Sequence, residues 1–226
     1  MLRKLLRKIL ARLGYEIRSL NICHAQDAIQ YNTPDYVDRF YSDTNLVDQY
    51  IRDNVPVHIL NIKSLLSSLN VRLSKDSYVL DIGCGTGHCL KMLADRYGVI
   101  NLTGTEFTEV VLAIAKSTFP YANYAQLDIM QASLPNRFDL ILCQQVLEHL
   151  TKPELALHNM VKMLKPKGII VLTIPDGRLD DFAGHIHFWS SESFKLMLEK
   201  ELTDCAISIG SLQDNISLYA VIRRRM

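Results

Sequence analysis

The sequence predicts an α/β domain in which a seven-stranded, mostly parallel sheet is covered by helices on both faces and preceded by a helical N-terminal extension. Three observations predict this fold. From residue 77 onward, apolar strand-like runs alternate with amphipathic helical stretches, as in parallel sheets. One of these runs ends in a glycine-rich turn that opens a helix. The chain has 226 residues, 48% of them hydrophobic, which suits one such domain with a short extension.

Residues 1–14 predict a basic amphipathic helix that ends at Gly14. Residues 1–18 carry six Lys and Arg against one acidic residue, Glu16, whereas the rest of the chain has more acidic than basic residues. The apolar residues recur at helical spacing and are Leu2, Leu5, Leu6, Ile9, Leu10 and Leu13. The helix is too short to span a bilayer, which takes roughly 20 residues. Three interpretations stay open: peripheral contact of residues 1–13 with anionic lipid, docking on the domain, or a dimer contact.

Residues 15–75 predict a helical extension that can form a lid over a ligand. The stretch from Asn45 to Asn70 has a helical pattern that is broken near Pro56. Tyr31 and Tyr41 are candidates to touch the ligand, and the alternative is that these tyrosines pack on the core.

Residues 76–226 predict the main domain. The expected helices cover residues 109–117, 153–164 and 190–200, with Thr151 as the N-cap of the second and residues 165–168 as a turn after it. The expected strands cover residues 78–81, 99–105, 121–126, 138–143, 169–174, 206–210 and 217–223, and the last two form a hairpin-like pair.

The most informative stretch is the first strand with its turn, Val-Leu-Asp-Ile-Gly-Cys-Gly-Thr-Gly at residues 79–87. Glycine reaches backbone angles closed to other residues and lets a ligand lie directly against the main chain. The spacing of the three glycines argues against a binding site for NAD or FAD, because His88 stands where the G-x-G-x-x-G pattern has its third glycine. No G-x-x-x-x-G-K-[ST] loop for nucleoside triphosphates occurs either.

The pattern D-x-G-x-G-x-G resembles motif I of the class I S-adenosylmethionine (SAM) methyltransferases. Residues 143–150, Cys-Gln-Gln-Val-Leu-Glu-His-Leu, resemble the E-V-L-E-H-[VL] signature of the small-molecule branch, with Gln145 in place of the first acidic residue. Residues 165–168 resemble the L-K-P-G-G turn of that family, with Lys167 in place of the first glycine. The resemblance covers residues 76–198 and implies a Rossmann-like fold, with SAM as cofactor.

The resemblance also implies a set of cofactor-binding residues. Glu106, at the end of the second strand, is placed to accept hydrogen bonds from the ribose hydroxyls, and Phe107 to lie against the adenine ring. Asp128 is placed to accept from the adenine amino group, while the main-chain amide of Ile129 donates to the ring. The whole expected set is Asp81, Gly83, Cys84, Gly85, Gly87, Glu106, Phe107, Asp128, Ile129 and Gln144.

Three histidines are candidates for the general base that deprotonates an acceptor, namely His149, His185 and His187. The alternative for His149 is a hydrogen bond within the core or a role in seating the cofactor. His185 and His187 lie in a Gly-His-Ile-His-Phe-Trp stretch that resembles the same methyltransferases and is expected to line the acceptor pocket. We expect no metal site, and Asp176, Asp180 and Asp181 to be solvated loop carboxylates.

These features predict a SAM-dependent methyltransferase that acts on a hydroxyl or other nucleophile of a small molecule or glycan. Bacterial surface-polysaccharide synthesis is a setting suggested by analogy, through the basic amino-terminal helix. Methylation of a lipid or quinone at a membrane, or a non-catalytic SAM-binding regulatory module, are the alternatives. The near-neutral charge argues against a nucleic-acid partner. The five cysteines form no C-x-x-C pair, which fits a cytoplasmic protein, and peripheral contact with the inner face of the membrane is the alternative that the basic helix leaves open.

Overall fold

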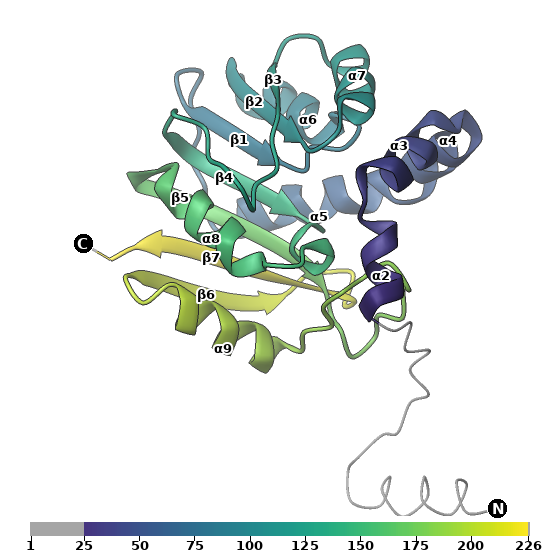
Figure 1. The fold of residues 1–226 in the computed structure, drawn as a ribbon. Coiled ribbons are helices and arrows are strands. Elements are labelled where there is room, and N and C mark those ends of the chain that lie inside the picture. The colour runs from purple at the N-terminus through teal and green to yellow at the C-terminus, as the bar shows by residue number, and fades with distance from the viewer. Residues whose placement is uncertain (1–24, 226) are drawn as a thin grey trace, which may run out of the picture.

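The computed structural model describes residues 25–225, and the expected basic helix at residues 1–14 lies outside them (Figure 1). The chain starts with the helices α2 (Ala25–Tyr31), α3 (Pro34–Ser42), α4 (Thr44–Asp53) and α5 (Val55–Ser68). The expected break near Pro56 is confirmed, because α4 ends at Asp53 and Pro56 lies in the first turn of α5, where it costs no hydrogen bond.

The sheet has seven strands among the described residues, as expected. Their bounds are β1 (Tyr78–Ile82), β2 (Asn101–Glu106), β3 (Asn123–Gln126), β4 (Phe138–Gln144), β5 (Leu164–Pro175), β6 (Cys205–Ser211) and β7 (Ser217–Arg224). Their order is β3-β2-β1-β4-β5-β7-β6, and only β7 runs antiparallel to its neighbours. The expected pairing of the last two strands is therefore confirmed, and the sheet is of the Rossmann-like, mostly parallel kind.

Helices cover both faces of this sheet (Figure 1). α5 packs on one face together with α6 (His88–Tyr97) and α7 (Glu109–Thr118). α8 (Pro153–Lys162) and α9 (Ser191–Glu201) cover the other face. Neighbouring residues of β1 supply the two cores, since Val79 belongs to the first and Leu80 to the second.

Two local predictions are wrong. Residues 165–168 are not a turn but the irregular first part of β5, where the pairing register with β4 shifts. Gly168 permits this pairing, because a Cβ there would lie 2.8 Å from the carbonyl oxygen of Phe138. The N-cap of α8 is Lys152 rather than Thr151, and its side chain makes no capping hydrogen bond.

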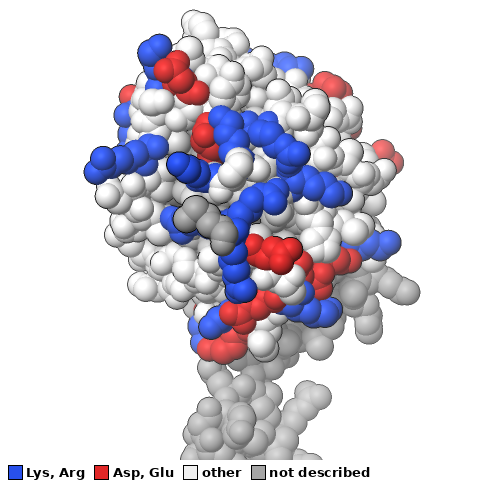
Figure 2. Space-filling view, turned by 90° about the vertical axis from the view of Figure 1, so that its left-hand side faces the viewer, with Lys and Arg blue, Asp and Glu red and all other residues white. Residues whose placement is uncertain are grey.

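The carboxyl ends of the parallel strands meet at one edge of the sheet, where β1 lies between β2 and β4. The chain leaves β1 toward β2 and β3 on one side and later returns to β4 and β5 on the other. In sheets with such a reversal of strand order, ligands bind outside the carboxyl ends of the strands at this point. Figure 2 shows that Lys and Arg side chains gather on the opposite side of the molecule.

No helix among the described residues combines the length and the apolar character that crossing a membrane requires.

Candidate active site

The turn after β1 is fastened to the neighbouring strand β2. The main-chain nitrogens of Gly83 and Cys84 both donate to the carbonyl oxygen of Thr105, at 2.9 and 3.0 Å. Gly83 has φ +66°, and a Cβ there would lie 2.4 Å from Val146. Gly87 has φ +80°, and a Cβ there would lie 3.0 Å from the carbonyl oxygen of Ala115 in α7. These two glycines therefore allow close packing of the turn.

Gly85 differs from its two neighbours because it faces open space. Its φ is +52°, and the nearest atom to a Cβ built there is the hydroxyl oxygen of Tyr41, at 4.0 Å. Tyr41 lies on α3, so the N-terminal extension reaches the turn. Burial, followed by the charges of Tyr50 and Glu106, raises the pKa of Tyr41 well above its usual value. The main chain at Gly85 thus borders a space that Tyr41 covers.

Two carboxyl groups lie near this turn, the buried one of Asp81 and the half-buried one of Glu106. Asp81 is the second-last residue of β1 and is 1% exposed, and its Oδ1 has no hydrogen-bond partner among the described residues. Burial, followed by the charge of Glu106, raises the pKa of Asp81 to about 8, and hydrogen bonds from Gln144 and Cys89 partly oppose the shift. Burial also raises the pKa of Glu106. The site therefore favours a ligand that brings positive charge.

Glu106 is fixed by two main-chain hydrogen bonds. Its Oε1 accepts from the nitrogen of Gly85 at 2.7 Å, and its Oε2 accepts from the nitrogen of Phe107 at 3.2 Å. Each carboxylate oxygen keeps a further acceptor position, so the pair of oxygens can still receive two hydroxyl groups.

The residues at the end of β3 offer a second binding edge. Asp128 accepts hydrogen bonds from the nitrogen of Met130 and from the side chain of Gln131, at 2.9 and 2.7 Å. The carbonyl oxygen of Ile129 accepts from Asn159 at 2.8 Å, which holds this loop against α8. Among the described residues none accepts a hydrogen bond from the main-chain nitrogen of Ile129. This donor is therefore available to a ligand.

A second group of polar side chains lies after β4, at the 3-10 helix η1 (Leu147–His149). The side chains of Glu148, His149 and His185 come together there, with one ligand-type atom of each within 4.8 Å of the others. The rings of His149 and His185 meet edge to face, with their centres 4.6 Å apart. Burial, followed by the charge of His185, lowers the pKa of His149 to about 4. His149 is therefore uncharged at neutral pH.

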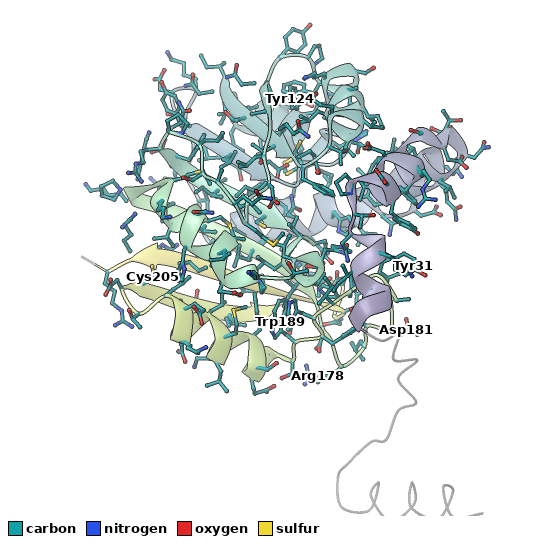
Figure 3. The ribbon with its side chains drawn as sticks, viewed as in Figure 1. Tyr31, Tyr124, Arg178, Asp181, Trp189 and Cys205 are labelled. Atoms are coloured by element: carbon teal, nitrogen blue, oxygen red, sulfur yellow. The ribbon has the colours of Figure 1, made fainter. Side chains whose placement is uncertain are left out.

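His187 lies apart from this pair in its contacts. Its Nε2 donates to the carbonyl oxygen of Leu150 at 2.9 Å, and its ring stacks on Trp189 with centres 4.6 Å apart. Trp189 in turn contacts Phe194 of α9, and Figure 3 shows it near that helix. Burial lowers the pKa of His187. These contacts anchor the loop after β5 to the body of the domain.

Two of the aspartates in the loop after β5 are not solvated, contrary to expectation. Asp176 is 4% exposed and pairs with Arg178 through several hydrogen bonds. Asp180 is nearly buried, and its Oδ2 lies 2.5 Å from Nδ1 of His185. Asp181 is exposed and lies on the same side of the molecule as Tyr31 of α2 (Figure 3).

Sequence reasoning gave no role to Glu148 and Asn32. Glu148 belongs to the quoted Val-Leu-Glu-His signature, so its residue type was a signal, but nothing in the pattern placed it against His185. Asn32 precedes α3, and its side-chain nitrogen donates to the carbonyl oxygen of Gly184 at 2.8 Å. His149 also approaches that oxygen through Nδ1, at 3.3 Å. The N-terminal extension and the histidine group thus share one anchor.

The chain is similar in sequence and in fold to known methyltransferases. Residues 80–172 match the family described as a methyltransferase domain. Trans-aconitate 2-methyltransferase of Escherichia coli O1:K1 / APEC is 28% identical over 110 residues, which make up 49% of this chain and 44% of that protein. The chain thus spans less than half the length of this curated relative.

Solved structures share the fold at low sequence identity. A methyltransferase in complex with the Haloferax volcanii Trm112 methyltransferase activator has a TM-score of 0.69 and 14% identity, covering 84% of this chain and 97% of its own. The plantazolicin methyltransferase BpumL, in complex with SAH, has a TM-score of 0.65 and 18% identity, covering 89% of this chain and 99% of its own.

Proposed function

We propose that the chain carries a class I SAM-dependent methyltransferase domain and transfers the methyl group of SAM to an oxygen atom of a small molecule or glycan. One observation carries the proposal. The main chain at Gly85 faces open space, its nitrogen contacts the half-buried carboxylate of Glu106, and the buried carboxyl group of Asp81 interacts with the charge of Glu106. A nucleoside with two positive charges, on its sulfonium and on its ammonium group, fits such a space.

The described residues fit SAM group by group. The unpartnered Oδ1 of Asp81 is an acceptor for the ammonium group, because a buried polar atom gains most from a charged partner. Glu106 offers two acceptors to the ribose hydroxyls. The free main-chain nitrogen of Ile129 and the side chain of Asp128 supply a donor and an acceptor to the adenine edge. Gly85 leaves room for the ligand, and Tyr41 covers it.

When bound, SAM supplies an electrophilic methyl group, and its sulfur keeps the electron pair of the broken bond. The main task of the chain is to hold the two reactants in line. In this proposal, Nε2 of His185 accepts the proton that the acceptor hydroxyl loses. Asp180 accepts the hydrogen on Nδ1 of this ring and so fixes its tautomer, as a buried aspartate does for a catalytic histidine.

The contacts of the histidines rank the three candidate bases. His185 has the aspartate partner that stabilises the ring after it takes a proton. His149 lies beside it, but burial opposes its protonation. Nε2 of His187 is already engaged with Leu150. His185 is therefore the proposed base when no metal ion is bound, and the ring of His149 lies beside it.

The test is an assay of methyl transfer from SAM with a labelled methyl group, run over a panel of acceptors. The panel contains small organic acids, nucleotide sugars, lipid-linked glycans and quinones, because relatives are named for acting on trans-aconitate and plantazolicin. Transfer to a member of the panel supports the proposal and identifies the acceptor class. Tight binding of NAD with no binding of SAM would overturn it.

Membrane contact through residues 1–13 is a separate proposal that rests on the sequence pattern alone. Anionic vesicles should sediment the full chain but not a chain lacking residues 1–13. Equal sedimentation of both forms would remove this proposal and leave the proposed reaction untouched.

A further inference from the structure

We propose that Glu148, His149 and His185 form a binding site for a divalent transition-metal cation, of which zinc is the best match. The site lies after β4, beyond the glycine turn, and each residue offers one ligand atom within 4.8 Å of the other two. The two histidine rings lie partly exposed and the glutamate buried. Three independent features of these residues support a cation.

The first feature is the unsatisfied carboxyl group of Glu148. The residue is 0% exposed, and neither Oε1 nor Oε2 has a hydrogen-bond partner within the part of the chain that the structure describes. Its backbone is held in place, because its carbonyl oxygen accepts from the nitrogens of Ile186 and His187 at 2.8 and 3.2 Å. A buried carboxyl group without a partner is costly, and a bound cation removes that cost. Burial raises the pKa of Glu148 to about 8, and a contact with the main chain of Glu148 itself partly opposes the shift.

The second feature is the outer hydrogen bonding of the two histidines. Nδ1 of His185 pairs with the carboxylate of Asp180 at 2.5 Å, and Nδ1 of His149 approaches the carbonyl oxygen of Gly184 at 3.3 Å. Metal-binding histidines almost always donate their second ring nitrogen to a carboxylate or a carbonyl oxygen in this way. Among the described residues, Nε2 of neither ring has a partner. Both Nε2 atoms are therefore free to bind a metal.

The third feature is the chemistry of the ligand set. Two imidazole nitrogens and one carboxylate suit Zn²⁺, which catalytic sites hold with three protein ligands and an open fourth position. Bonds of about 2.1 Å place tetrahedral ligands roughly 3.4 Å apart, so the three side chains would close by about 1 Å around the cation.

Binding of a cation by these residues does not depend on the proposed function. The role that we give to the cation deepens the proposed function and rests on it. In the metal-bound form the histidine nitrogens are ligands, and the open position takes the acceptor oxygen. A Lewis acid at that oxygen lowers the pKa of an alcohol, so the proton leaves to solvent without a histidine base. Metal-free and metal-bound chains therefore activate the acceptor by different routes in the same pocket.

The experiment is a calorimetric titration of the metal-free full chain with Zn²⁺ in the absence of SAM, followed by absorption spectroscopy with Co²⁺ alone. We expect one cation per chain and a cobalt spectrum typical of four-coordinate nitrogen and oxygen ligands. Glu148→Gln, His149→Ala and His185→Ala should each weaken Zn²⁺ binding at least 100-fold. Asp180→Asn should weaken it about 10–100-fold through the ring that it orients.

His158→Ala is the matched control, because His158 lies on α8 and bonds to the carbonyl oxygen of Glu201, away from the site. This variant should bind Zn²⁺ like the parent chain. Circular dichroism of each variant shows whether it is folded. The cobalt spectrum of the parent chain tests the proposal even if the variants do not fold. Absence of binding to the parent chain, equal binding by the folded site variants, or a thiolate-to-cobalt band would overturn the proposal. Methyl transfer is measured separately, so its failure is distinguishable.

Discussion

The carboxylate of Glu106 accepts a hydrogen bond from the main-chain nitrogen of Gly85 at 2.7 Å. This contact joins the end of β2 to the turn that follows β1. Because the same carboxylate shapes the turn and borders the proposed ribose position, its removal should affect both. The following predictions start from this contact.

Glu106→Ala should weaken SAM binding about 10–100-fold, since hydrogen bonds to a charged group contribute about 1.5–3 kcal/mol each. Isothermal titration calorimetry with SAM measures the change. Glu109→Ala is the control, because Glu109 is an exposed glutamate in the first turn of α7. If both variants bind SAM alike, Glu106 does not hold the ribose.

Gly85→Ala should abolish SAM binding through the methyl group that it adds beside the ligand space. It should also lower the free energy of unfolding by about 1–2 kcal/mol, because alanine is strained at φ +52°. Gly98→Ala is a close control, since Gly98 has φ +64° and nothing within 4 Å of a built Cβ. The two variants should lose similar stability in thermal melts. Loss of SAM binding by both would show that strain, rather than the position, is responsible.

Asp81→Asn should stabilise the ligand-free chain at neutral pH while weakening SAM binding. The native pKa of Asp81 is about 8, against 3.8 for the free residue, so the native state binds a proton that the unfolded state has lost. Stability of the parent chain therefore falls as pH rises from about 4 to about 8. An asparagine does not titrate, and its advantage should grow over this window.

Melting temperatures of Asp81→Asn and the parent chain between pH 5 and 9 measure this effect. We expect the variant to lie about 2–6 °C higher at pH 8, corresponding to about 1–2 kcal/mol. Asp95→Asn, at an exposed residue paired with Lys91, should show no such trend. A difference that shrinks with rising pH would contradict the raised pKa.

His185→Ala should lower kcat about 10²–10⁴-fold once an acceptor is found, which is the usual contribution of general acid–base catalysis. Asp180→Asn should lower kcat by a smaller factor, because it acts through His185. His187→Ala should mainly lower stability, since its ring stacks on Trp189. Steady-state kinetics and thermal melts of the three variants separate these effects, and full activity of His185→Ala would refute its role.

The sequence was a sufficient guide to the parts of the site that follow strands directly. Asp81, Glu106 and Asp128 lie at or just beyond the carboxyl ends of three expected strands, and the parallel sheet brings those ends to one edge. The glycine spacing predicted positive φ angles, and Gly83, Gly85 and Gly87 all have them. Local pattern and sheet geometry therefore define this half of the site.

The other half depends on how a long loop folds, which no local pattern encodes. Asp180 meets His185 and Glu148 meets both histidines only because the loop after β5 doubles back over η1. The hydrogen bond from Asn32 to Gly184 spans 152 residues of sequence. Such contacts are set by tertiary packing, so the histidines were predicted as candidates but their partners were not.

The most direct test of the central claim is calorimetric titration of the intact chain with SAM, alongside Asp81→Asn. We expect the chain to bind one SAM and the variant to bind it at least tenfold more weakly, because the amide that replaces the carboxylate of Asp81 is uncharged and pairs more weakly with the ammonium group. Absence of SAM binding, or equal affinity of the two proteins, would contradict the assignment of this site.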